Sequence, residues 1–317
     1  MTLDVLTVGR VGVDLYAEEP GADFIEARRF QKSVGGSPTN VAVAAARLGL
    51  RAAVFTKVGD DGLGKYVRTA LAEQFGVDTR FVGTHPSLRT PIVVAVMDPA
   101  DDPQFLMYRE PQAPDATIVP DEVDLDLVRE VPIFWVSGGA LAVEPSRDTT
   151  RLLLRERHRR GYTILDLDYR PVMWSSQDEA RGAIGAAVDA ATVAVGNSKE
   201  CEVALGESEP DAAADALLAR GVELAIVKLG GEGVLVATPE ERAIVPPVPV
   251  EVVSGLGAGD AFGGALCFGL LSGMAAVETV EFANAAGALV ASRLLCADAM
   301  PTEQEVRALM EASSARR

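Results

Sequence analysis

Short apolar runs alternate with longer amphipathic stretches along most of the chain. Each run has the length and the β-branched content of a buried strand, and helical stretches near 146–160, 176–190 and 208–220 separate the later ones. Strands that alternate with helices imply βαβ crossovers, so the pattern predicts an α/β fold with a mostly parallel sheet and helices on both faces. The predicted core strands are 3–8, 52–58, 133–137, 163–167, 192–195 and 224–229.

The alternation is interrupted in two segments. Residues 92–97 and 104–108 have the pattern of two strands joined by a turn with no helix between them, which predicts an antiparallel hairpin. Residues 15–32 are mixed and polar and contain Pro20-Gly21, which indicates short strands outside the main core. Both segments therefore point to a separate small sheet.

A glycine-rich stretch, Ser254-Gly255-Leu256-Gly257-Ala258-Gly259-Asp260, precedes an apolar run of helical length. The β-branched residues 248–253 before it predict a strand, so we expect a strand, a glycine turn and a helix. Free N–H groups at a helix start next to glycines suit a phosphate. Asp260 in the first turn could take a proton from a hydroxyl during phosphoryl transfer. The alternative is a plain glycine turn in which Asp260 caps the helix.

A second glycine cluster, Gly35-Gly36-Ser37-Pro38-Thr39-Asn40, precedes an alanine-rich helix expected over 41–48. Pro38 suits a first helical turn and Gly49 suits the C-terminal end. The Asn40 amide can both donate to and accept from a sugar hydroxyl. A capped helix without a ligand explains the same residues equally well.

Several further polar or glycine-rich groups follow predicted strands. Ligands of open α/β sheets bind at the carboxyl ends of strands, so this shared location predicts one ligand site. Taken singly, each group has a structural alternative: a turn for Asp14, a helix cap for the segment 197–200, and a plain hairpin for 228–237. The groups are Asp14, the segment 166–170, the segment 197–200, Gly230-Gly231 and the stretch 255–259.

Composition limits the function classes. The 317 residues are 48% hydrophobic but only 5% aromatic, which predicts a large aliphatic core. A net charge of −17 argues against nucleic acids and anionic membranes as partners. Three widely spaced cysteines suggest neither a disulfide framework nor a zinc site. With no signal-peptide pattern and no apolar membrane span, we expect a cytoplasmic protein.

Together these motifs resemble those of the ribokinase-like sugar kinases, also called PfkB carbohydrate kinases. The segments 35–40 and 59–64 are similar to the amino-terminal signature, and Gly257-Ala258-Gly259-Asp260 to the carboxyl-terminal one. The resemblance implies a three-layer ribokinase-like fold with a small β-sheet lid. The lid would be formed by 15–32 and 86–113, and the main domain by 1–14, 33–85 and 114–317. A homodimer formed through the lid is also implied.

The resemblance also implies the roles of individual residues. Asp260 would be the catalytic base, and Gly257, Ala258 and Gly259 would form the anion hole. Glu200 would hold Mg²⁺ through water, with ATP as phosphate donor. Dependence on a monovalent cation stays open, because many members have Asp-Thr where this chain has Ser254-Gly255. The sugar would contact Asp14, Gly35, Gly36 and Asn40, and the nucleotide Asn197, Lys228, Gly230, Gly233, Ser254, Gly257, Gly259 and Asn284.

Within the family, Asp166-Leu167-Asp168-Tyr169-Arg170-Pro171 is similar to the acid-sugar kinases, where the third residue is commonly Asn. Asp168, together with Tyr108-Arg109-Glu110 and Ala113-Pro114-Asp115, is most similar to kinases of 5-dehydro-2-deoxy-D-gluconate in inositol breakdown. Arg109, Asp168 and Arg170 would then contact a sugar acid, although Arg170 could instead form a structural ion pair with Asp166 or Asp168. Alternative substrates are 2-keto-3-deoxygluconate and neutral sugars such as ribose or fructose. A non-catalytic nucleotide-binding protein would have no need of Asp260.

Overall fold

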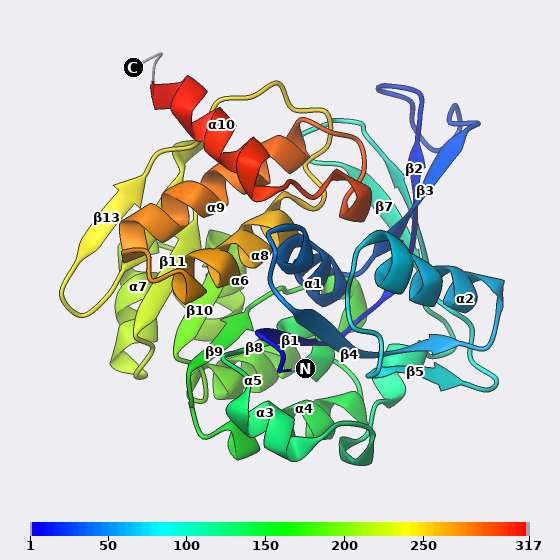
Figure 1. Ribbon diagram of the computed structural model, residues 1–317, viewed down its shortest axis with the longest axis horizontal. Coiled ribbons are helices and arrows are strands. Elements are labelled where there is room, and N and C mark those ends of the chain that lie inside the picture. The colour runs from blue at the N-terminus through cyan, green and yellow to red at the C-terminus, as the bar shows by residue number, and fades with distance from the viewer. Residues whose placement is uncertain (1, 315–317) are drawn as a thin grey trace.

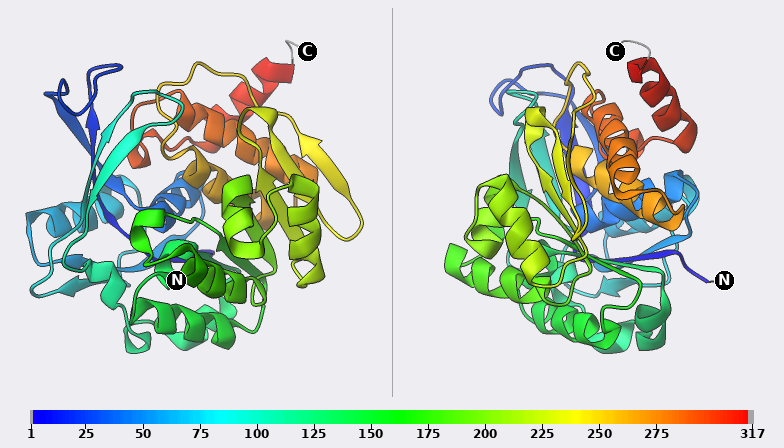
Figure 2. Two further views of the ribbon diagram at one scale, coloured as in Figure 1. Left: turned by 180° about the vertical axis from the view of Figure 1, so that it is seen from behind. Right: turned by 90° about the vertical axis from the view of Figure 1, so that its left-hand side faces the viewer.

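A nine-stranded sheet runs through the main body of the protein, and helices cover both of its faces (Figures 1 and 2). The computed structural model describes residues 2–314. The strand order is β13-β12-β11-β10-β9-β8-β1-β4-β5, and neighbours are parallel except where β12 pairs with β11 and β13. The strands are β1 (Val5–Val8), β4 (Ala52–Gly59), β5 (Val82–His85), β8 (Ile133–Ser137), β9 (Tyr162–Asp166), β10 (Val193–Asn197), β11 (Leu224–Lys228), β12 (Val234–Ala237) and β13 (Arg242–Val245).

Alternate residues of the central strands belong to two separate cores. In β8, Ile133 and Trp135 pack under one layer of helices, whereas Phe134 and Val136 pack under the other. This period of two follows from the pleat of a strand, and burial on both faces explains the continuous apolar runs in the sequence. The predicted α/β architecture with helices on both faces is therefore confirmed.

The two helical layers come from different parts of the chain. The first combines helices from both ends of the sequence, and the second is formed by consecutive helices of the middle. The first layer contains α1 (Ser37–Arg47), α2 (Gly62–Thr69), α8 (Ala258–Leu271), α9 (Ala276–Ala291) and α10 (Glu303–Ser314), and the second α3 (Leu125–Glu130), α4 (Ser146–Arg157), α5 (Gln177–Val188), α6 (Ser198–Leu205) and α7 (Pro210–Ala219).

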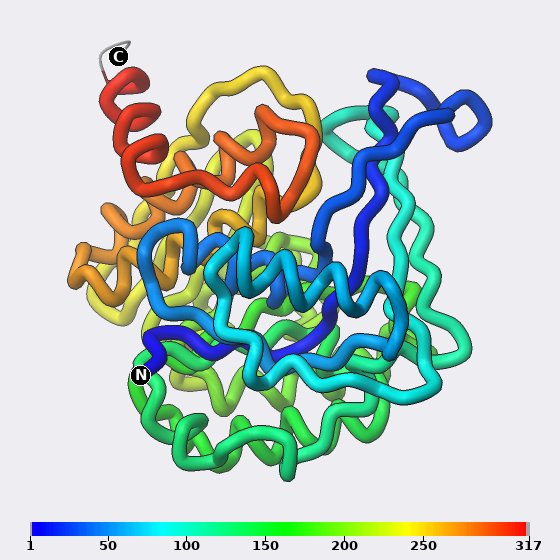
Figure 3. The backbone as a smooth tube through the Cα atoms, turned by 45° about the vertical axis from the view of Figure 1, so that its right-hand side comes forward, coloured from blue at the N-terminus to red at the C-terminus, as the bar shows by residue number. Residues whose placement is uncertain are grey.

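A small four-stranded sheet rises from one side of the main body (Figure 3). Its order is β3-β2-β6-β7, with strands β2 (Gly12–Ala17), β3 (Phe30–Gly35), β6 (Ile92–Val96) and β7 (Gln104–Tyr108). The expected hairpin is confirmed, because β6 and β7 pair in antiparallel fashion. The small sheet also takes in residues 12–14 and 33–35, which the family resemblance assigned to the main domain.

The strand expected over 248–253 is wrong. This segment has no regular secondary structure, and the chain enters α8 from an irregular loop. Prolines at 246, 247 and 249 remove backbone donors that a strand would need, and Val252 and Val253 are exposed. At the end of the segment, the N–H groups of Val253 and Ser254 both donate to the carbonyl of Ala291, which ties the loop to the end of α9.

None of the helices within residues 2–314 is both long enough and apolar enough to span a bilayer. Cys201, Cys267 and Cys296 are all buried free thiols.

Candidate active site

A cleft of about 290 Å³ lies between the small sheet and the edge where the main strands end. It collects residues from opposite ends of the chain, as expected for ligand sites at the carboxyl ends of parallel strands. The residues singled out in the sequence that line it are Asp14, Gly36, Asn40, Arg109, Asp168, Arg170, Glu200, Lys228, Gly257, Gly259 and Asp260.

Asp260 is the third residue of α8 and faces the start of α1 across the cleft. The Asn40 side-chain amide donates a hydrogen bond to its Oδ2 at 2.9 Å. Asn40 Oδ1 is buried and has no partner among residues 2–314. A buried acceptor that receives no hydrogen bond lowers the stability of the fold. This oxygen is therefore suited to receive a hydrogen bond from a ligand hydroxyl beside Asp260.

The pKa of Asp260 is raised from its ordinary value. Burial is the main cause, hydrogen bonds from Asn40 and Ser37 counter it, and the charge of Asp168 adds to the rise. No cation pairs directly with Asp260 among the ion pairs of residues 2–314. A carboxylate held by neutral donors stays basic enough to accept a proton from an alcohol.

The helix start before Asp260 has the properties of an anion site. Gly257 precedes α8 with φ +81°, a left-handed conformation that favours glycine, and no side chain within residues 2–314 caps the helix. The Lys228 ammonium lies 3.5 Å from where a β-carbon of Gly259 would be. Unpaired N–H groups and a nearby cation together suit a phosphate.

Asp14 lies inside β2 rather than after the first core strand. Its carboxylate occupies the space beside Gly35, where a β-carbon would come within 2.0 Å of Oδ1, so a residue with a side chain cannot stand there. The Tyr16 hydroxyl donates to Asp14 Oδ2 at 2.9 Å. Burial raises the pKa of Asp14 to about 6, with the Tyr16 hydrogen bond opposing and the charge of Asp260 assisting.

Arg10 is a buried guanidinium of the cleft that the sequence reasoning missed. It forms a two-pronged ion pair with Asp168, and Arg170 Nε contacts the same carboxylate at 3.2 Å. Burial would raise the pKa of Asp168, but Arg10 and Arg170 outweigh it and lower that pKa. The ion pair of Arg170 with Asp168, one of the two structural alternatives, is thus present. The only signal for Arg10 is a lone arginine directly after a buried strand.

Arg109 also has a carboxylate partner. It pairs with the buried Asp115, which in turn accepts a hydrogen bond from Val11 N at 2.9 Å. The expectation that Arg109 reaches the cleft agrees with the structure. Asp115 belongs to a segment that carries the family resemblance, but its pairing with Arg109 was not foreseen, because no local pattern links the two residues.

A second group of charges lies nearer α8. Burial raises the pKa of Asp166 at the end of β9, with Lys228 opposing that rise.

Glu200 and Asn197 form a reciprocal capping box at the start of α6, so the capping interpretation is correct. Within residues 2–314 no three His, Cys, Asp or Glu side chains cluster as metal ligands. The carboxylate of Glu200 can therefore meet a Mg²⁺ ion only with water or phosphate completing the shell.

The remaining residues assigned to ligands do not line the cleft. Ser254 is buried and accepts a hydrogen bond from Leu256 N at 3.3 Å, and Asn284 donates to the carbonyl of Pro246 at 3.1 Å. The set outside the cleft is Gly35, Ala258, Asn197, Gly230, Gly233, Ser254 and Asn284.

The segment 59–64 anchors the small sheet. The Asp61 carboxylate caps α2 by accepting from Gly64 N at 2.8 Å, and it also accepts from Thr90 N at 2.8 Å. Thr90 lies just before β6, so Asp61 fastens the root of the hairpin to the main body.

The model of the "pfkB family carbohydrate kinase" matches residues 2–303 of the chain. The protein therefore belongs to this family, and it is a carbohydrate kinase by membership. The fold and the cleft described above agree with that assignment.

Three similar proteins define the neighbourhood within the family. The 5-dehydro-2-deoxygluconokinase of Photobacterium profundum is 35% identical over 311 residues, covering 95% of this chain and 93% of that protein. A fructokinase of Vibrio cholerae with bound fructose, ADP and calcium is 28% identical, with a TM-score of 0.84 over 97% of this chain and 99% of its own. An uncharacterized sugar kinase of Pyrococcus horikoshii in complex with ATP is 26% identical, with a TM-score of 0.80 over 96% and 99%.

Proposed function

We propose that this kinase transfers the γ-phosphate of ATP to the terminal hydroxyl of 5-dehydro-2-deoxy-D-gluconate. The observation that carries the proposal is a cluster of three arginines, Arg10, Arg109 and Arg170, in the same cleft as Asp260. A protein with a net charge of −17 repels a sugar acid unless cations are set into the site. The name of the Photobacterium profundum relative supports the choice of acid.

In this proposal the terminal hydroxyl lies between Asn40 and Asp260. Asp260 accepts its proton as the oxygen attacks phosphorus, and Asp14 binds a further hydroxyl of the substrate. The N–H groups of residues 257–259, with Lys228, neutralise charge on the transferred phosphate. Mg²⁺ held through water near Glu200 would supply further positive charge to the nucleotide phosphates. Arg109 and Arg170 are the expected contacts of the substrate's anionic groups, the carboxylate and the phosphate being transferred.

The test compares kcat/KM for 5-dehydro-2-deoxygluconate, 2-keto-3-deoxygluconate, ribose and fructose with the wild-type enzyme. We expect kcat/KM for 5-dehydro-2-deoxygluconate to exceed that for each of the other three substrates by at least about tenfold. A difference of this size is no larger than the effect of one charged hydrogen bond. A preference for ribose or fructose would refute a sugar-acid kinase. A preference for 2-keto-3-deoxygluconate would refute only the choice of acid.

The small sheet is proposed to close over the sugar as a lid, with residues 15–32 and 86–113 as its moving parts. The turn between β6 and β7 already reaches the glycine stretch, because Gly255 N donates to the carbonyl of Ala100 at 2.8 Å. Closure would exclude water and limit wasteful ATP hydrolysis. Hydrogen exchange should slow in these two segments when the acid is added, and protection confined to the main domain would refute the lid.

A homodimer through the small sheet is proposed as well. Leu106 and Tyr108 of β7 are 46% and 60% exposed, which gives the outer face of the lid an apolar surface. Replacing Leu106 with Glu should shift a dimer to monomer in sedimentation velocity, and a wild-type monomer at micromolar concentration would refute the proposal.

A cytoplasmic location remains a prediction, supported by ATP as the proposed donor.

A further inference from the structure

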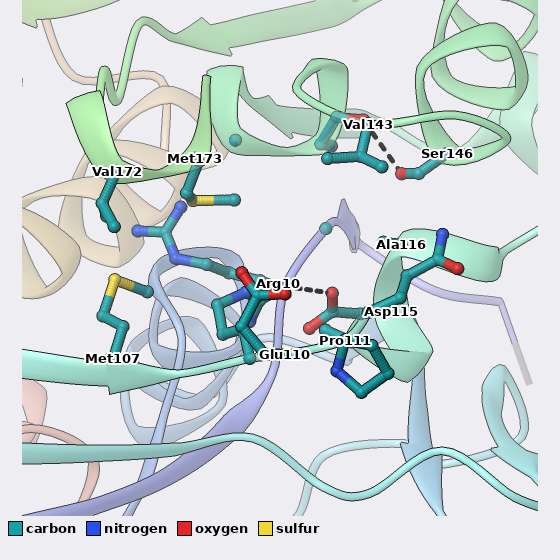
Figure 4. Close-up of a pocket in the computed structure, with 16 residues that line it drawn as sticks. Arg10, Met107, Glu110, Pro111, Asp115, Ala116, Val143, Ser146, Val172 and Met173 are labelled. Carbon is teal, nitrogen blue, oxygen red and sulfur yellow. Dashed lines mark hydrogen bonds and ion pairs between the residues drawn. The ribbon is translucent and has the colours of Figure 1, made fainter. Parts of the chain in front are cut away.

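A side chamber of about 170 Å³ adjoins the cleft and has no role in the proposed reaction so far. The two cavities share Arg10, Met107 and Arg109, so these side chains form the boundary between them. Figure 4 shows Met107 and Pro111 on one side of the chamber and Val143 and Ser146 on the other.

We propose that this chamber holds the carboxylate end of an open-chain substrate, between Arg10 and Arg109, and so selects linear acids over ring sugars. The inference rests on the proposed function and adds where the far end of the substrate lies. It also assigns different roles to the arginines. Arg10 and Arg109 line the chamber, whereas Arg170 lines only the main cleft and acts nearer the reacting end of the substrate.

The setting of Arg10 is that of a fixed carboxylate receptor. Arg10 is 8% exposed, and Asp168 takes two of its five N–H donors, which leaves three for a ligand. Gly139 allows this position, because a β-carbon there would lie 2.5 Å from Arg10 Nη1. An arginine already immobilised by a carboxylate and by packing loses little entropy when it binds a second one.

The walls of the chamber match the rest of the acid end. Met107 and Met173 provide flexible apolar surface, and Ser146 provides a hydroxyl, although that hydroxyl already donates to the carbonyl of Ala140 at 2.9 Å. In a 2-deoxy acid the carbon next to the carboxylate is a methylene. Glu110 and Asp115 also line the chamber, and the Asp115 carboxylate is paired with Arg109. The apolar part of the wall at Met107 and Met173, beside two guanidinium groups, suits a CH₂–COO⁻ terminus better than it suits a hydroxylated carbon.

Ring chemistry explains why a linear site is useful. In 5-dehydro-2-deoxygluconate no hydroxyl can close a five- or six-membered ring on the C5 ketone, because C2 is a methylene and C1 is the carboxylate. The molecule is thus an open chain in water. In contrast, 2-keto-3-deoxygluconate closes to furanose and pyranose forms through its C5 and C6 hydroxyls. A cleft that continues into a side chamber accommodates the extended chain and leaves a ring unable to reach Arg10 and Arg109 together.

The test fills the chamber from two positions without touching the cleft. Val143→Phe and Ala116→Leu both alter chamber residues that do not line the cleft, and Val119→Phe is the matched control at a half-exposed valine outside both cavities. Each variant is assayed at saturating ATP with 5-dehydro-2-deoxygluconate and with erythrulose. Erythrulose keeps the hydroxymethyl ketone end of the acid and lacks the carboxylate end.

We expect each filling variant to lower kcat/KM for the acid by roughly 10- to 100-fold, the loss of a charged hydrogen bond, with less than about threefold change for erythrulose. The control should leave both values unchanged. Equal losses for both substrates, or no loss for the acid in either variant, would overturn the proposed role of the chamber. Neither result would contradict the proposal of a sugar-acid kinase. A wild-type enzyme that does not prefer the acid to erythrulose would overturn both proposals.

Discussion

Two carboxylates of the same cleft are held in opposite ways. Asp260 is held by the neutral donors Asn40 and Ser37, and its pKa is raised. Asp168, which is more deeply buried than Asp260, lies between Arg10 and Arg170, and its pKa is lowered in spite of that burial. The difference shows that residue type and burial do not define a base. The basicity of each carboxylate depends on whether its partner is a neutral donor or a cation. A paired cation stabilises the charged carboxylate and so makes protonation less favourable.

Removing the basic carboxylate tests that contrast with the largest effect. Asp260→Asn keeps the size and the hydrogen bond to Asn40 but cannot accept the substrate's proton. We expect turnover to fall by about 10²–10⁴ with ATP binding nearly unchanged, measured by ADP release and by nucleotide titration. The surface variant Asp178→Asn should leave both measurements unchanged. Near-normal turnover in Asp260→Asn would end its assignment as the base.

Removing a cation from the cleft should have a smaller effect that depends on the substrate. Arg109→Ala removes a charged hydrogen bond from a sugar acid, so kcat/KM for acids should fall by an amount worth roughly 1.5–3 kcal/mol, with little change for neutral sugars. Because the variant leaves Asp115 buried and unpaired, the double variant Arg109→Ala, Asp115→Asn should show the same loss. The surface variant Arg151→Ala serves as control. Equal losses for acids and neutral sugars would contradict a carboxylate-binding role.

Asp14 offers a test by stability. Its pKa is about 6 in the fold and near 3.8 when unfolded, so above pH 6 the charged native form costs up to about 3 kcal/mol. Below about pH 4 the carboxyl is neutral in both states and the cost disappears. Asp14→Asn should therefore raise Tm by a few degrees at pH 7 to 8 and by nothing near pH 4, in thermal unfolding followed by circular dichroism. An equal or lower Tm at pH 8 would show that the native carboxylate is not destabilised.

The smallest effect concerns the neutral donor itself. The hydrogen bond from Asn40 opposes the rise in the pKa of Asp260, so Asn40→Ala should raise that pKa further. The acidic limb of the pH profile of kcat should then move upward by up to about one pH unit, because a net hydrogen bond is worth about 1 kcal/mol. An unchanged or lowered limb would mean that the group titrating in kcat is not Asp260.

Local patterns were sufficient for most of the architecture. The apolar runs predicted the core strands, the missing helix predicted the β6–β7 hairpin, and the glycines before Asp260 predicted the start of α8. These features are encoded by neighbours in sequence, since strand burial, turns and helix starts depend on a few adjacent residues. The wrong strand at 248–253 shows the limit, because β-branched residues there were outweighed by prolines and by the lack of a neighbouring strand.

The sequence by itself therefore determined the layers, the glycine turn at the start of α8 and Asp260 as a candidate base. Only the tertiary structure decided which charges meet. Arg10 and Asp168 are separated by 158 residues, and Asn40 and Asp260 by 220, yet each pair forms a hydrogen bond. Such contacts depend on how β1, α1, α8 and β9 stack against one another, and no local pattern specifies that arrangement. The same packing set the pKa values and opened the side chamber beside Arg10.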